Sequence, residues 1–262
     1  MGDRVLTEID RRGVATVWLN RPEVNNAYDG ELIAQLTETI GRLDRDPGLR
    51  ALVIRGKGRH FQAGADLAYL RQIIDAPPEE NRRFSAATVE AMRALQVFAR
   101  PVVVLVHGGC FGGGIGLVTG ADVAISTNDA MFALTETLWG IVAAPIIPQL
   151  IHAIGIRHTR HIGITGERFD AATALRIGLV HQLCPPNDLD AAGARAVDHI
   201  LRAAPDAVRR HKQLTFEIGD LVSADALYAR LSELAASGRM TDEVREGLAA
   251  FAEKRKPSWY PG

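Results

Sequence analysis

The stretch that decides the fold of this chain is Gly108-Gly109-Cys110-Phe111-Gly112-Gly113-Gly114-Ile115-Gly116, which follows an apolar run and precedes a helix-compatible one. A similar stretch, His60-Phe61-Gln62-Ala63-Gly64-Ala65-Asp66-Leu67, begins 48 residues earlier. Each predicts a strand-to-helix turn with free backbone N–H groups. Two such donors aimed at one point form an oxyanion hole, which stabilises the anionic oxygen of an enolate. Glu136, 23 residues beyond Gly113, is a candidate acid/base.

The composition is typical of a globular protein with a substantial core: 262 residues, 47% hydrophobic and 23% charged. A net charge of −1 and the lack of a long Lys/Arg block argue against a nucleic-acid partner. Apolar stretches such as Ile141–Ile147 are too short to cross a bilayer, so no membrane partner is expected. The start of the chain is not a secretory signal, and the only cysteines are Cys110 and Cys184. These features predict a cytoplasmic protein without disulfides.

The first half of the chain alternates strand and helix patterns. The run Val14–Leu19 is rich in β-formers, and Val5–Ile9 is its predicted hairpin partner. The order predicted after this hairpin is helix 30–43, strand Ala51–Ile54, helix 80–99, strand Pro101–Val106, a helix start within Gly112–Gly120, and strand Val123–Ser126. This alternation predicts an α/β fold with parallel strand pairs and right-handed crossovers.

The second half of the chain shows a different pattern. After about residue 130 the strand signal fades, and the sequence predicts helices over 146–162, 170–178, 190–204 and 216–251. The Pro185-Pro186-Asn187-Asp188 segment strongly favours a turn or loop and so breaks the regular secondary structure. We therefore predict a core of residues 1–188 and a helical region of residues 189–262.

Several motifs occur along the whole chain in a fixed order. They are Leu19-Asn20-Arg21-Pro22-Glu23 with Asn26-Ala27, the two glycine-bearing stretches, Ala121-Asp122, Phe132…Glu136…Gly140-Ile141, Leu175–Val180 and Glu246-Gly247…Phe251…Glu253-Lys254-Arg255. In this order and spacing they resemble the enoyl-CoA hydratase/isomerase (crotonase) superfamily. The resemblance implies a spiral of repeated ββα units followed by a C-terminal helical trimerisation region, in a homotrimer or a dimer of trimers. It also implies an acyl-CoA substrate, an enolate intermediate and no separate cofactor, because coenzyme A is part of the substrate.

The resemblance also assigns roles to individual residues. The oxyanion-hole donors would be the backbone N–H groups of Ala65 and Gly113, and the acid/base would be Glu136. The implied contacts to the substrate or its CoA moiety are Arg21, Ala27, Ala63, Asp66, Leu67, Gly112 and Trp139, with Phe251 and Lys254 reaching CoA from a neighbouring subunit. From the residues alone, Asp66 is favoured as a helix N-cap. No metal is predicted, because His158 and His161 lack a third ligand nearby.

The reaction depends on a departure from the family pattern. The best-known hydratases use two glutamates, and the first of these positions is Gly116 here. The apolar neighbours Phe132, Leu134, Leu138 and Trp139 predict a raised pKa for the remaining Glu136.

The leading prediction for this single-glutamate site is a hydratase. The stretch Ala143-Ala144-Pro145-Ile146-Ile147-Pro148 resembles bacterial hydratases of branched or carboxylated substrates of the methylglutaconyl or isohexenylglutaconyl type. The alternatives are a Δ3,Δ2-enoyl-CoA isomerase, an acyl-CoA decarboxylase and a scaffold that binds acyl-CoA without turnover. A water-holding pocket would favour hydration, and a dry one would favour proton shuttling.

Overall fold

A computed structural model describes residues 2–219, 242, 246, 249–250 and 253–261. The strands are β1 (Val5–Ile9), β2 (Val14–Leu19), β3 (Ala51–Gly56), β4 (Val102–Val106), β5 (Gly109–Phe111), β6 (Val123–Thr127), β7 (Met131–Ala133), β8 (Phe169–Asp170) and β9 (Gln182–Cys184). The α-helices are α1 (Gly30–Asp44), α2 (Leu67–Asp75), α3 (Pro78–Gln96), α4 (Gly114–Thr119), α5 (Ile147–Thr165), α6 (Ala171–Arg176), α7 (Leu189–Arg202) and α8 (Pro205–Gly219). Short 3-10 helices are η1 (Pro22–Val24), η2 (Glu136–Trp139), η3 (Ala144–Ile146) and η4 (Pro186–Asp188).

The main sheet has the strand order β1-β2-β3-β4-β6-β9. The β1–β2 hairpin is antiparallel, and each later pair in this sheet is parallel. This is the arrangement that the alternation of strands and helices predicts, because a parallel pair needs a crossover connection. The hairpin bounds are those expected from the sequence.

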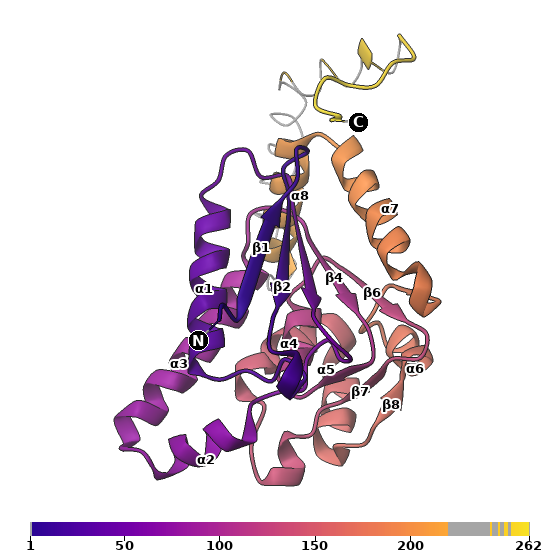
Figure 1. The fold of residues 1–262 in the computed structure, drawn as a ribbon. Coiled ribbons are helices and arrows are strands. Elements are labelled where there is room, and N and C mark those ends of the chain that lie inside the picture. The colour runs from indigo at the N-terminus through magenta and orange to yellow at the C-terminus, as the bar shows by residue number, and fades with distance from the viewer. Residues whose placement is uncertain (1, 220–241, 243–245, 247–248, 251–252, 262) are drawn as a thin grey trace.

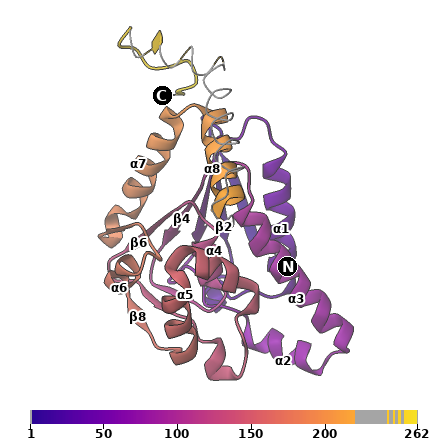
Figure 2. The same ribbon diagram turned by 180° about the vertical axis from the view of Figure 1, so that it is seen from behind.

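Both faces of this sheet are covered, and its central strands are therefore apolar throughout. In β4, Val102, Val104 and Val106 belong to the larger core with α1 and α3, whereas Val103 and Leu105 face a second core with α7. Figures 1 and 2 show α1 and α3 on one side of the sheet and α7 on the other. The predicted boundary at 188/189 coincides with the start of α7.

The prediction of helices only beyond residue 130 is wrong. Strand β7 pairs with β5 and β8 in a second, three-stranded sheet, and β9 extends the main sheet. Each of these strands has two or three residues, which is too short to show an alternating pattern. Pairing with distant segments holds them, and the rings of Phe132 and Phe169 stack across β7 and β8 at a centroid distance of 5.7 Å. Helix α8 also begins well before the predicted start at residue 216.

The turn between β2 and α1 is held by one buried amide side chain. Asn26 accepts a hydrogen bond from the Arg21 N–H and donates from Nδ2 to the carbonyls of Lys57, His60 and Phe61, at 2.8 to 3.2 Å. Its side chain is fully buried, and its backbone is left-handed with φ 59°. This one residue therefore fixes the turn against the segment that follows β3.

Replacing this amide tests its role. Asn26→Ala is expected to lower the free energy of unfolding by about 3 kcal/mol, because buried backbone groups lose their partners. The control is Asn25→Ala: Asn25 has the same left-handed backbone, at φ 54°, but its side chain makes no hydrogen bond within the described residues. That control should lose about 1 kcal/mol. Urea titration measures both, and equal losses would contradict the assignment.

Candidate active site

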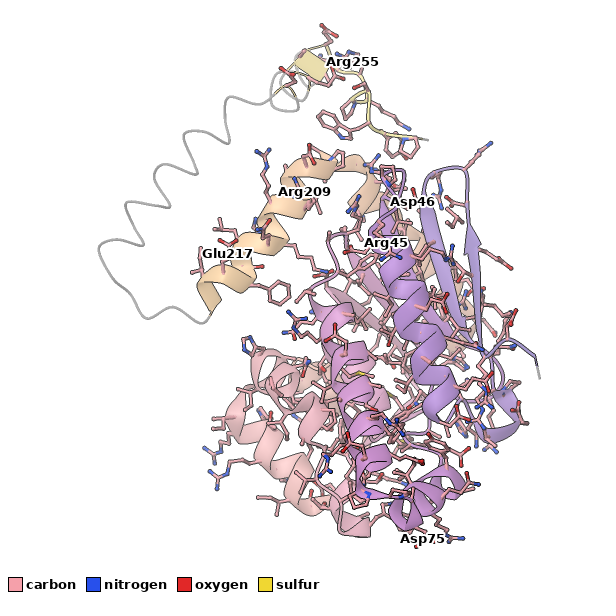
Figure 3. All side chains as sticks on the ribbon, turned by 90° about the vertical axis from the view of Figure 1, so that its left-hand side faces the viewer. Arg45, Asp46, Asp75, Arg209, Glu217 and Arg255 are labelled. Atoms are coloured by element: carbon pink, nitrogen blue, oxygen red, sulfur yellow. The ribbon has the colours of Figure 1, made fainter. Side chains whose placement is uncertain are left out.

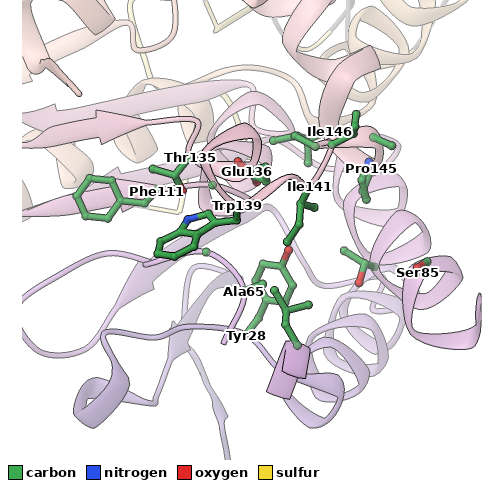
Figure 4. A pocket seen from close by; sticks show the side chains of 18 of the residues that line it. Tyr28, Ala65, Ser85, Phe111, Thr135, Glu136, Trp139, Ile141, Pro145 and Ile146 are labelled. Atoms are coloured by element: carbon green, nitrogen blue, oxygen red, sulfur yellow. The ribbon is translucent and has the colours of Figure 1, made fainter. Parts of the chain in front are cut away.

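A cavity of about 520 Å³ lies between α2, α3, the Gly112-Gly113 turn and residues 135–146. Apolar side chains make most of its wall, and Figure 4 shows Tyr28, Glu136, Ile141 and Ile146 around it. A concave, mainly apolar site with a few polar groups is the usual form of a small-molecule site.

Two distant segments meet side by side at this cavity. Gln62 forms a parallel bridge with Cys110, in which the Phe111 N–H donates to the Gln62 carbonyl at 2.9 Å. Beyond this bridge, a Cβ built on Gly64 would lie 3.2 Å from the Phe111 carbonyl oxygen, and Ala65 and Gly113 follow directly after the two turns. Both residues line the cavity. The two predicted turns are therefore neighbours in space.

Ala65 and Gly113 both keep an unpaired backbone N–H at this point. Tyr28 donates to the Gly64 carbonyl at 2.9 Å and accepts from the Asp66 N–H at 2.8 Å, so it bridges to the residue between them. In such a parallel bridge the N–H of Ala65 points away from Tyr28. Among the described residues, neither the Ala65 nor the Gly113 amide has an acceptor. Two free donors beside one cavity are what an oxyanion hole requires.

Glu136 directs its carboxyl against the same turn. A Cβ built on Gly112 would lie 3.0 Å from Glu136 Oε1, and Gly112 has φ 51°, so only glycine fits there. Glu136 Oε2 is buried and has no hydrogen-bond partner in the described structure. Burial raises the pKa of Glu136, which agrees with the expectation from its apolar surroundings.

The apolar environment comes only partly from the expected neighbours. Phe132 and Leu134 are buried, whereas the side chains of Leu138 and Trp139 are each 62% exposed. Leu138 and Trp139 belong to η2, a single turn at the surface. The expectation that all four neighbours desolvate Glu136 is therefore wrong for Leu138 and incomplete for Trp139, which lines the cavity but remains exposed.

Apolar side chains surround Gly116, where the family resemblance implies a second glutamate. A Cβ built on Gly116 would collide with Ile146 and lie 2.9 Å from the sulfur of Met92. Ile146 and Met92 both line the cavity, whereas Gly116 does not. Among the residues that the structure places at this cavity, Glu136 is the single carboxylate.

Tyr28 is a residue of this cavity that the sequence reasoning missed. A Cβ built on Gly113 would lie 2.6 Å from the Tyr28 ring and 2.7 Å from its hydroxyl, so the phenol sits against the glycine turn. Burial and, secondly, the negative charge of Glu136 raise the pKa of Tyr28, which keeps the hydroxyl protonated. Tyr28 directly follows the Asn26-Ala27 motif, but this position in the sequence does not show that its ring reaches Gly113.

The remaining predicted contacts divide into two groups. Ala63, Leu67, Gly112 and Trp139 line the cavity, in addition to the residues above. Arg21, Ala27 and Asp66 do not line it.

An ion-pair network holds Arg21 and Asp66 away from the cavity. Arg21 donates to Asp66 at 3.0 Å, pairs with Asp29 at 3.3 Å and bonds the Ala27 carbonyl. Asp66 caps α2 by accepting from the N–H groups of Ala68 and Tyr69, as expected of an N-cap.

The predicted C-terminal contacts lie elsewhere. Phe251 falls outside the described residues. Lys254 is exposed, and Figure 3 shows the adjacent Arg255 at the opposite end of the molecule from Asp75, where α2 ends beside the cavity. Lys254 therefore cannot reach the cavity of its own subunit. Within the described ranges no group of three or more His, Cys, Asp and Glu could hold a metal ion, and none of the helices is long and apolar enough to cross a membrane.

Comparison with known proteins shows the family to which this chain belongs. The family model described as enoyl-CoA hydratase/isomerase matches residues 10–261. A Thermus thermophilus protein classed provisionally as an enoyl-CoA hydratase is 32% identical, covering 96% of this chain and 99% of that one. The trans-2-decenoyl-acyl-carrier-protein isomerase of Streptococcus mutans is 28% identical, covering 97% of each chain. The crystal structure of an enoyl-CoA hydratase from Shewanella pealeana superposes with a TM-score of 0.93 at 33% identity, covering 98% of this chain and 96% of that one.

These findings define an enzyme of the hydratase/isomerase type with the crotonase fold. The chain belongs to the enoyl-CoA hydratase/isomerase family. The mixed α/β fold expected from the sequence is confirmed.

The buried carboxyl of Glu136 has a measurable consequence for stability. Burial raises the pKa of Glu136 above its ordinary value of 4.5, so the folded protein favours the protonated carboxyl. The free energy of unfolding is therefore highest below pH 4.5 and falls as the pH rises through the raised pKa. Glu136→Gln is therefore expected to melt at a higher temperature than the wild type at pH 8, with the difference shrinking towards pH 4.

Differential scanning fluorimetry across this pH range measures the effect. The matched variant is Glu90→Gln, whose carboxyl is exposed on α3 and outside the cavity. It should leave the melting temperature nearly unchanged. A Glu136→Gln variant that melts below the wild type at pH 8 would show that the carboxylate is not strained in the folded protein.

Proposed function

We propose that the protein is an acyl-CoA hydratase that adds water across the 2,3 double bond of an enoyl-CoA. The observation that supports this most is the lone, desolvated carboxyl of Glu136 beside the unpaired amides of Ala65 and Gly113. The thioester oxygen would accept from both amides and would become negative when the β carbon is attacked. Removing one such donor typically costs about 3–4 kcal/mol in the transition state.

The reaction needs one base that also acts as an acid. The carboxylate of Glu136 removes a proton from water while the water oxygen bonds to the β carbon. The double-bond electrons then move onto the thioester oxygen, which the two amides stabilise. The enolate next takes the proton from the Glu136 carboxyl at the α carbon, so the carboxylate is regenerated. A raised pKa suits this exchange, because the proton must be both gained and released.

The substrate class that we propose is a branched or carboxylated enoyl-CoA. The Ala143–Ile146 segment lines the cavity with small and branched side chains. Arg168, the one positively charged side chain among the described lining residues, could pair with a distal carboxylate. No cofactor is proposed beyond the coenzyme A of the substrate.

The second candidate is a Δ3,Δ2-enoyl-CoA isomerase. The specific observation in its favour is the apolar wall that Ile146 and Met92 form where a second glutamate would stand. An isomerase needs only one base to move a proton between two carbons, and a dry wall suits it. Decarboxylation of a glutaconyl-type thioester and binding without turnover are the remaining outcomes of the assay below.

Absorbance of the conjugated enoyl thioester separates these reactions. The wild type is expected to bleach the absorbance of a 2-enoyl-CoA, and Glu136→Gln to lose about 100-fold or more in kcat. Glu90→Gln serves as the folded control. A rise in absorbance from a 3-enoyl-CoA with no bleaching would favour the isomerase. Release of CO₂ from a glutaconyl-CoA would favour the decarboxylase, and no change with any of these would favour the binding scaffold.

We further propose a cytoplasmic homotrimer or dimer of trimers, in which Lys254 and Phe251 of one subunit reach the CoA held by its neighbour. The position of the C-terminal segment, far from the cavity of its own subunit, supports this (Figure 3). An exposed ammonium suits the phosphates of CoA.

Lys254→Ala is expected to raise KM about three- to tenfold with kcat changed less than about twofold. The reason is that a contact to the CoA phosphates stabilises the bound substrate and the transition state equally. Lys256→Ala is the control, since the Lys256 ammonium lies 4.1 Å from the centroid of the Tyr260 ring. Steady-state kinetics on one enoyl-CoA gives both parameters. A fall in kcat with KM unchanged would contradict the assignment.

A further inference from the structure

Two polar oxygens face the cavity without a partner. Glu136 Oε2 has no hydrogen bond, and the Tyr28 hydroxyl makes none within the described residues. Figure 4 shows the Tyr28 ring with its hydroxyl directed towards the side of the cavity that carries Glu136 and Ile141. A buried polar atom such as Glu136 Oε2 normally has a partner, so a ligand or a water molecule is expected beside it.

The two side chains lie against adjacent residues of the same turn, and the Glu136 charge acts on the Tyr28 hydroxyl. The carboxyl of Glu136 packs against Gly112, and the phenol of Tyr28 packs against Gly113. The α carbons of adjacent residues are about 3.8 Å apart. A thioester bound at the Gly113 amide would therefore lie next to both the carboxyl and the phenol.

We propose that the Tyr28 hydroxyl and Glu136 together hold the water that attacks the β carbon, so that the phenol takes the place of the glutamate absent at position 116. A bound water needs at least two polar partners, and Ile146 and Met92 offer none. This inference rests on the proposed hydratase function and names the group that completes that site.

The protons and electron pairs of this hydration step balance without any further reagent. The water donates one hydrogen to Glu136 and the other to the Tyr28 oxygen, which leaves a lone pair for the β carbon. As the carbon–oxygen bond forms, Glu136 takes its proton and later returns it to the α carbon. Tyr28 neither gains nor loses a proton, so it orients the water and is a positioning residue.

The position of Tyr28 is fixed by its surroundings. Its backbone bridges Ala65, and its ring lies 6.4 Å from the ring of Phe84, which in turn packs edge-on with Tyr69. Removing only the hydroxyl keeps these apolar contacts. Tyr28→Phe therefore tests the hydroxyl alone. Tyr69→Phe is the control, because Tyr69 belongs to the same aromatic cluster but does not line the cavity.

Two reactions of the same enzyme test the proposal. Hydration of a 2-enoyl-CoA needs the water, whereas exchange of the α hydrogen of a saturated acyl-CoA in D₂O needs only Glu136 and the oxyanion hole. Tyr28→Phe is expected to lower kcat/KM for hydration about 10-fold or more while exchange changes less than about twofold. Tyr69→Phe should leave both rates within about twofold.

The possible outcomes are distinct. Hydration by Tyr28→Phe within twofold of the wild type would overturn the inference and leave the hydratase function standing. An equal loss in both reactions would also overturn it, because the hydroxyl would then act on the thioester or on the fold. A wild type that exchanges the α hydrogen but never hydrates would overturn the proposed function together with this inference.

Discussion

The parallel pairing of Gln62 with Cys110 is the constraint on which this site depends. It joins the segment after β3 to β5, and it ends before either segment reaches its glycine turn. Ala65 and Gly113 therefore both reach the cavity with their N–H groups unused within the described residues. The Gln62 side chain fixes the first turn, because its amide donates to the Gly64 carbonyl and accepts from the Gly64 N–H. A backbone geometry, and not a charged side chain, thus prepares the place where negative charge would develop.

Much of the fold follows from local pattern. The hairpin of β1 and β2 is set by alternating residues and a glycine turn, and in α1 each expected apolar position, from Leu32 to Leu43, is buried. The second sheet could not be predicted, because β5, β7 and β8 have two or three residues each. Such strands exist through pairing with distant segments, a tertiary effect that no local window contains.

The site shows the same division. Ala65, Gly113 and Glu136 could be proposed from motifs, because each belongs to a recognisable turn. Tyr28 could not, since its importance comes from the contact of its ring with Gly113, a residue 85 positions away. The replacement of a glutamate by Gly116 was visible, but the filling of the vacant space by Ile146 was not. Arg21 carried a plausible charge for CoA, and the structure commits that charge to Asp29 and Asp66.

A lone carboxyl also changes the electrostatics of the site. Where two glutamates share a cavity, each raises the pKa of the other by repulsion. Here burial is what raises the pKa of Glu136, and the neighbouring phenol remains neutral because its own pKa is raised as well. The basicity of Glu136 is thus set by how dry the wall around it is. Ile146 and Met92 add apolar wall to the same cavity, at the position where the family resemblance implies a second glutamate.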